Sequence, residues 1–121
     1  MATPITIVDD SAMSRKLMIR ALPPTWSVAI TQATNGKEAL DAYRAKKADV
    51  MFLDLTMPVM DGYEVLEVLK KEGLNTFVIV VSADIQPKAQ ERVMQLGATA
   101  FIKKPVSTEE VARILKQYGI I

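Results

Sequence analysis

The chain has 121 residues, with 15 lysines and arginines against 14 acidic residues and with neither cysteine nor histidine. This length fits one domain with a single core, which we expect to span residues 1–121. Without cysteine or histidine, the chain has no disulfides, no zinc site of the usual kind and no triad with a histidine base. Any chemistry must therefore use carboxylates, lysine and hydroxyl groups.

The distribution of charge and apolar residues excludes two further classes. The formal net charge is +1 and no basic run exceeds two residues, which argues against nucleic-acid binding. No apolar stretch approaches the ~20 residues that a membrane span requires, and the first ten residues do not resemble a signal peptide. The sequence predicts a soluble, cytoplasmic protein that binds neither nucleic acid nor membranes.

Short apolar runs alternate with helical patterns along the whole chain. The runs at 5–8, 50–54 and 77–82 are nearly continuous and rich in β-branched residues, as is typical of strands covered on both faces. Weaker or more alternating runs lie at 28–32 and 98–102, and this pattern favours edge strands.

Five helices are predicted between and after these strands. The first runs from Ser11 to about Leu22, where two prolines follow, and its inward face is expected to hold Leu17, Met18 and Ala21. The fourth begins at Pro87, ends at Gly97 and is expected to pack Val93 and Met94. The others have start signals at Asn35, at Gly62 and at the pair Ser107 and Glu110, which have capping-box spacing.

Five strands alternating with five helices predict an α/β, doubly wound (βα)5 fold with a parallel five-stranded sheet. Ligands bind such sheets beyond the carboxyl ends of the strands, where the strand order reverses. If the order is the flavodoxin-like 2-1-3-4-5, the first and third strands are neighbours at that point.

Polar residues follow four of the predicted strands at this edge: Asp9 and Asp10, Asp54, Ser82, and the pair Lys103 and Lys104. Taken singly, each has an ordinary explanation as a helix cap, a turn residue, half of an ion pair or a surface lysine. Together they place three carboxylates in one cluster, and like charges ~5 Å apart repel by roughly 3 kcal/mol at an effective dielectric of 20. The cluster therefore needs a cation.

The donor types indicate which cation and which chemistry. Carboxylate oxygens without histidine or cysteine favour Mg²⁺ or Mn²⁺, and Mg²⁺ commonly shares its shell with water and phosphate oxygens. Lysine and hydroxyl groups can bind the other phosphate oxygens. A carboxylate facing a metal, a lysine and a hydroxyl is well placed to attack phosphorus.

These segments resemble the receiver domain of two-component response regulators, the CheY-like superfamily, in its stand-alone form. The resemblance covers the whole chain and rests on "VDDS" (8–11), "LDLTMPVMDG" (53–62), "VVSA" (80–83) and "GATAFIKKP" (97–105). It implies a phosphorylation-dependent signalling switch in which Asp54 accepts a phosphoryl group from a histidine kinase or phosphotransfer domain. Such a protein catalyses only its own phosphoryl transfer and dephosphorylation, and chemotaxis is one possible pathway.

The resemblance also assigns roles at the predicted site. Asp10, Asp54 and the backbone carbonyl of Thr56 would bind Mg²⁺ or Mn²⁺ directly, and Asp9 would bind it through water. Phosphoryl oxygens would be bound by the Ser82 hydroxyl, the Ala83 backbone amide and Lys104. In that case Lys103 would be a surface residue.

The same resemblance implies how the signal leaves the site. On phosphorylation Ser82 would move inward and Phe101 would fill the space, which changes the surface of the fourth helix, fifth strand and fifth helix for a downstream protein. A phosphatase is a further possible partner. Phenylalanine stands at position 101 where tyrosine is frequent, and Ser82 where threonine is common. The Lys104–Pro105 peptide bond is expected to be cis.

The sequence leaves four other interpretations to consider. A haloacid dehalogenase phosphatase needs a second aspartate where this chain has Thr56, and an FMN-binding flavodoxin needs a first loop without the two anions of "DDSAMS". A pseudo-receiver would keep the fold as an interaction module without phosphorylation. The chain could also be a receiver domain trimmed from a multidomain regulator.

Overall fold

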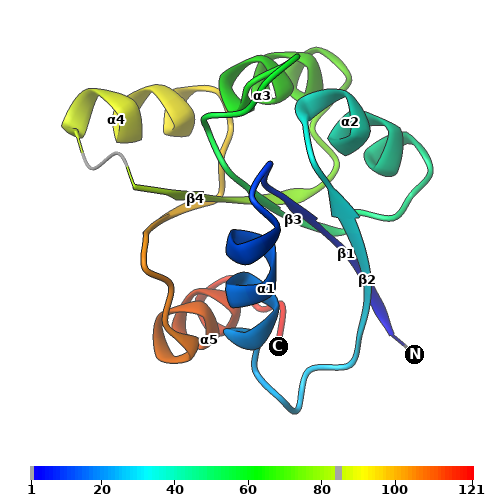
Figure 1. The fold of residues 1–121 in the computed structure, drawn as a ribbon, viewed down its shortest axis with the longest axis vertical. Helices are drawn as coiled ribbons and strands as arrows, with labels where there is room; N and C mark the ends of the chain where they lie inside the picture. The colour runs from blue at the N-terminus through cyan, green and yellow to red at the C-terminus, as the bar shows by residue number, and fades with distance from the viewer. Residues whose placement is uncertain (1, 84–85) are drawn as a thin grey trace.

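The computed structural model describes residues 2–83 and 86–121 (Figure 1). The strands are β1 (Thr3–Val8), β2 (Val28–Ala33), β3 (Val50–Leu53), β4 (Phe77–Ser82) and β5 (Ala100–Lys103). The helices are α1 (Ala12–Arg20), α2 (Gly36–Arg44), α3 (Gly62–Lys71), α4 (Pro87–Gln95) and α5 (Thr108–Gln117). All strand pairs are parallel and the order is β2-β1-β3-β4-β5, so the predicted (βα)5 flavodoxin-like fold is confirmed.

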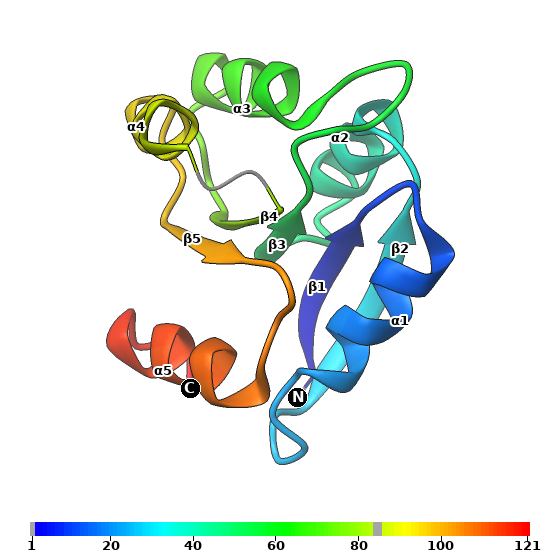
Figure 2. The ribbon, with the colours of Figure 1, turned by 60° about the vertical axis from the view of Figure 1, so that its left-hand side comes forward.

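Helices cover both faces of the sheet. Helices α2, α3 and α4 lie on one face, and α1 and α5 lie on the other (Figure 2). Alternate residues of β3 enter the two cores: Met51 and Leu53 pack with the α2–α4 side, whereas Val50 and Phe52 pack with the α1–α5 side. This explains why the central strands are continuously apolar, while the edge strand β2 exposes several of its side chains.

Helix starts agree with their sequence signals. Ser11, Asn35 and Ser107 each accept a hydrogen bond from the backbone of the third residue beyond them. Asp61 caps α3 with a full capping box to Glu64. Helix α4 begins at Pro87 and is followed by Gly97 with φ of +100°. Of the described helices, none is long and apolar enough to cross a membrane.

Two predicted inward residues are exposed, and those predictions are wrong. Leu17 and Met94 are each 47% exposed, whereas their neighbours Met18 and Val93 are 4% and 0% exposed. Adjacent residues in a helix point about 100° apart, so only one of each pair can face the sheet when the covered stripe is narrow. Helix α1 is also shorter than predicted, ending at Arg20.

Candidate functional site

The register of the sheet brings Asp9 and Asp54 to the same level. Val8 of β1 pairs with Leu53 of β3, and each aspartate is the next residue in its chain segment. The Asp54 amide continues the ladder by donating to the Val8 carbonyl at 3.0 Å, and the Asp9 amide donates to Ala33 at 3.0 Å. The strand order thus places two carboxylates side by side at the switch point, as the sequence predicted.

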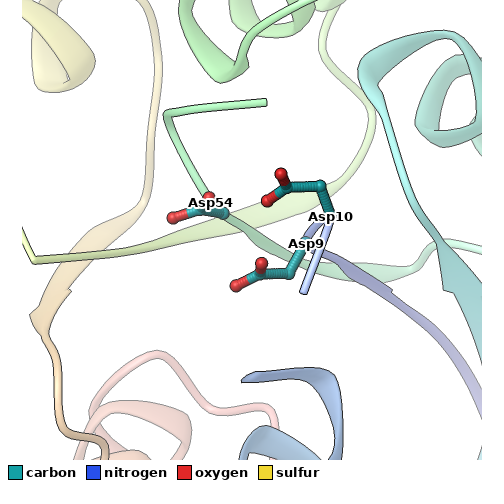
Figure 3. Close-up of side chains that lie close together, drawn as sticks. All are labelled: Asp9, Asp10 and Asp54. Carbon is teal, nitrogen blue, oxygen red and sulfur yellow. The ribbon is translucent and has the colours of Figure 1, made fainter. Parts of the chain in front are cut away.

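Three carboxylates form one cluster at this edge. Oxygen atoms of Asp9, Asp10 and Asp54 all lie within 4.8 Å of one another (Figure 3). Asp9 and Asp54 are 6% and 8% exposed, while Asp10 stands open to solvent. Hard oxygen donors this close together suit a small divalent cation such as Mg²⁺, and the exposed side of Asp10 leaves room for water and phosphate ligands.

The ammonium group of Lys104 faces this cluster. Its Nζ donates to Asp9 Oδ2 at 2.8 Å and to Asp54 Oδ1 at 3.3 Å. The Lys104 amide also donates to the Ser82 carbonyl at 2.9 Å, which ties the β5–α5 loop to the end of β4. The neighbouring Lys103 is exposed, so the structure distinguishes the two lysines as the family resemblance implied. The Lys104–Pro105 bond is cis.

The arrangement shifts the pKa of Asp54 and the pKa of Lys104. Burial raises the pKa of Asp54 and the Asp9 charge raises it further, against the opposing effect of Lys104. Burial alone would lower the pKa of Lys104, but its hydrogen bond to Asp9 and the charges of both aspartates outweigh this effect and raise that pKa. The site therefore holds a buried carboxylate whose like-charge repulsion Lys104 relieves only in part, and a metal cation would relieve the rest.

The remaining predicted residues lie around this cluster. Ser82 ends β4 and is 3% exposed. Ala83 and Thr56 are exposed in the loops that follow β4 and β3. Phe101 is half-buried in β5, pairs with Val80 and packs against the core on the α2–α4 side. The structure thus places all the predicted residues on the carboxyl edge of the sheet or on the adjoining strand.

Two glycines, Gly62 and Gly36, pack closely against the loop that carries Asp54. The sequence pattern marks Gly62 only as the start of a helix. The Gly62 amide donates to Leu55 at 3.0 Å, and a Cβ atom at Gly62 would lie 2.5 Å from the Asp54 carbonyl oxygen. Gly36 is similarly close to this loop, with its amide 3.0 Å from the Met60 carbonyl. Only glycine allows these approaches of backbone to backbone.

A cavity of about 510 Å³ adjoins the cluster on the α1 side of the sheet. Its polar end is formed by Asp9, Asp54 and Lys104, and its apolar wall includes Leu17 and Val106. This accounts for the exposure of Leu17, which faces the cavity instead of the core. The cavity was not anticipated from the sequence, because it depends on the spacing between α1 and the β5–α5 loop.

Comparison with known proteins agrees with this geometry. The sequence model of the response regulator receiver domain matches residues 5–116. The chain is 32% identical to the chemotaxis protein CheY of Thermotoga maritima over 113 residues, covering 93% of this chain and 94% of that protein. It is 37% identical to a protein-glutamate methylesterase/protein-glutamine glutaminase of Treponema denticola, covering 87% of this chain but 29% of that protein.

A solved structure gives the same result. In the CheX–CheY–BeF3–Mg²⁺ complex from Borrelia burgdorferi, the matching chain has a TM-score of 0.85 and 28% identity, with 97% of this chain and 89% of that chain covered. The protein therefore belongs to the response regulator receiver domain family. As a CheY-like receiver domain it is a module of two-component signalling, and its likeness to the methylesterase is confined to part of that longer protein.

Proposed function

We propose that residues 1–121 act as one receiver domain that is switched by phosphorylation of Asp54. The donor is a phosphohistidine of a histidine kinase or phosphotransfer domain. The observation that carries this proposal is the environment of Asp54: a buried carboxylate with a raised pKa, in a cluster with Asp9 and Asp10 and 3.3 Å from Lys104.

The reaction is a single transfer. An Asp54 carboxylate oxygen attacks phosphorus, forming an acyl phosphate, and the bond between phosphorus and the donor imidazole nitrogen breaks. The electron pair of the broken bond stays on that nitrogen, which takes up a proton. Hydrolysis of the acyl phosphate by water returns Asp54 and releases inorganic phosphate. Beyond these two reactions on its own side chain, the domain is not an enzyme.

The residues present fit a magnesium ion. Asp10, Asp54 and the Thr56 carbonyl would hold it directly, and Asp9 would hold it through water, with Mn²⁺ as a substitute. When bound, the ion offsets the negative charge of the phosphoryl oxygens. The chain's own groups do the rest: Lys104, the Ser82 hydroxyl and the Ala83 amide bind the phosphoryl oxygens and stabilise their charge.

The phosphoryl group then changes the outer surface. Its added charge draws Ser82 inward, Phe101 turns into the space, and the surface formed by α4, β5 and α5 favours a downstream protein. Phe101 is suited to this role because it is half-buried on β5 and packs toward the α4 side. Without a hydroxyl it fills space but forms no hydrogen bond there.

The partners follow from the same proposal. The kinase approaches over Asp10 and the neighbouring apolar residues Met13 and Leu17, which are 62% and 47% exposed. A phosphatase shortens the life of the acyl phosphate, and the whole cycle takes place in the cytoplasm. Chemotaxis is one candidate pathway, given the likeness to CheY proteins.

Intact-mass measurement tests the proposal. Wild-type protein incubated with acetyl phosphate and Mg²⁺ should gain the mass of one phosphoryl group, and Asp54→Asn should gain none. Omitting Mg²⁺ should also prevent the gain. Stoichiometric labelling of Asp54→Asn would show that Asp54 is not the acceptor. An unlabelled wild-type protein would favour the pseudo-receiver, an interaction module without phosphorylation.

A further inference from the structure

Arg15 connects three segments beside the acidic cluster and has no part in the function proposed above. Its Nη1 donates to the backbone carbonyl of Asp9 at 2.8 Å, and its Nε donates to the side-chain oxygen of Gln32 at 2.8 Å. Arg15 lies on α1, Asp9 follows β1, and Gln32 lies near the end of β2. One guanidinium thus holds the start of a helix and the ends of two strands together.

The bond to the Asp9 carbonyl determines how Asp10 is presented. That carbonyl belongs to the planar peptide group that joins Asp9 to Asp10. The same plane contains the amide nitrogen and the Cα atom of Asp10, so a bond that holds the oxygen also orients the Asp10 backbone. The other groups of Asp9 are also held: its amide by Ala33, and its carboxylate by the Ser11 amide at 2.9 Å and by Lys104. Asp10 itself is exposed, so its backbone is what keeps it in place.

We propose that Arg15 is a positioning residue for the divalent-cation site. By holding the Asp9–Asp10 peptide it keeps the Asp10 carboxylate close to those of Asp9 and Asp54 before the ion binds. This proposal rests on the proposed function, because it assumes that the cluster binds Mg²⁺. Arginine suits the role better than lysine, since its planar guanidinium donates to two acceptors in fixed directions.

Positioning and plain electrostatics predict opposite effects of removing the arginine. A positive charge near a cation site repels the ion, so a purely electrostatic role means that Arg15→Met would bind Mg²⁺ more tightly. Loss of a group that orients a metal ligand instead weakens binding, typically 10- to 100-fold. The sign of the change therefore separates the two roles.

Mg²⁺ titration of metal-free protein by calorimetry is the test. We expect Arg15→Met to weaken Mg²⁺ binding about tenfold or more. Gln32→Ala, which removes one of the two acceptors and no charge, should weaken it by a smaller factor, and Arg15→Lys should recover part of the loss. Lys16→Met is the matched control, because it removes one charge from the exposed adjacent position of α1 and should leave the affinity within about twofold.

Discrimination between ions gives a readout that general destabilisation would not change. Ca²⁺ accepts loose and variable coordination, whereas Mg²⁺ demands near-octahedral geometry. Arg15→Met should therefore lose more affinity for Mg²⁺ than for Ca²⁺. Gln32→Ala provides the same comparison in a variant that keeps Arg15, should Arg15→Met fail to fold.

The possible results are distinguishable. If Arg15→Met binds Mg²⁺ as tightly as the wild-type protein or more tightly, the role of Arg15 is overturned. The proposed function still stands in that case, provided that Asp54→Asn binds Mg²⁺ more weakly than the wild-type protein. Equal losses for Mg²⁺ and Ca²⁺ would also overturn it. Absence of Mg²⁺ binding by the wild-type protein would overturn both proposals together.

Discussion

The ammonium group of Lys104 lies 2.8 Å from the carboxylate of Asp9, a contact between residues 95 positions apart in the chain. It connects the loop before α5 to the end of β1, and at 3.3 Å the same group also reaches Asp54. One lysine therefore offsets part of the negative charge of two buried carboxylates.

Replacing Lys104 by methionine should destabilise the metal-free protein by about 2 kcal/mol, because it leaves two carboxylates without their cation in a half-buried site. Urea unfolding in the presence of a chelator measures this. Phosphoryl uptake from acetyl phosphate should also slow by about 100-fold. Lys103→Met, at the exposed neighbouring position, is the control and should change neither quantity. Equal behaviour of the two variants would contradict the assignment of Lys104.

Asp54→Asn should stabilise the metal-free protein at neutral pH. The pKa of Asp54 is raised in the folded state, so its contribution to stability is greatest below the unfolded value near 3.8 and is lost as the pH rises through the folded value. Asparagine does not ionise, so the variant avoids that loss. It also gives up the charged hydrogen bond from Lys104, so the net gain in the free energy of unfolding is only on the order of 1 kcal/mol.

Thermal unfolding of Asp54→Asn between pH 4 and pH 8, in chelator, checks the sign. The variant should lose less stability than the wild-type protein as the pH rises across this interval. Asp41→Asn, on the exposed surface of α2, should follow the wild-type curve. Parallel curves for Asp54→Asn and wild type would show that burial and the Asp9 charge do not raise the pKa of Asp54.

Gly62→Ala should impair the site although alanine favours helices. The added Cβ would meet the Asp54 carbonyl oxygen at 2.5 Å and the Leu55 Cα at 2.9 Å, so the loop must shift at a cost of about 2 kcal/mol. Mg²⁺ affinity and unfolding should both be measured. Gly73→Ala is the control: its φ of +95° makes alanine strained, but no atoms crowd that position, so it should lose stability without losing Mg²⁺ affinity.

Phe101→Ala should separate phosphorylation from its consequence. The variant should still take up a phosphoryl group, because Phe101 lies outside the carboxylate cluster, but hydrogen exchange in α4 and α5 should no longer respond to phosphorylation. Phe77→Ala truncates a 42%-exposed phenylalanine at the opposite end of the sheet and should keep the response. A normal response in Phe101→Ala would exclude Phe101 as the switch.

Much of the fold was predictable because the strand signal is local. Continuous apolar runs marked the central strands, and the alternation of strands with helices fixed the parallel arrangement. Once β1 and β3 are neighbours, Asp9 and Asp54 must meet at the carboxyl edge. The acidic cluster could therefore be predicted from the sequence. The distinction between Lys103 and Lys104 came from the family resemblance.

Other features depend on three-dimensional packing and have no local signal. Leu17 and Met94 have the residue types of core positions, yet their helices turn adjacent residues inward. Arg15 looks like any arginine on an exposed helix, because its two acceptors come from other segments. The close contact of Gly62 with Asp54 depends on the angle at which α3 follows the loop. The sequence indicates only that a helix starts near Gly62.

Chemical mapping of the modified side chain identifies the residue that carries the phosphoryl group, which we propose to be Asp54. Protein treated with acetyl phosphate and Mg²⁺ is reduced with borohydride, which converts an aspartyl phosphate into homoserine, and is then digested and sequenced by mass spectrometry. We predict homoserine at position 54, dependent on Mg²⁺. Homoserine at Asp9, Asp10 or any other aspartate, with position 54 unmodified, would contradict the account.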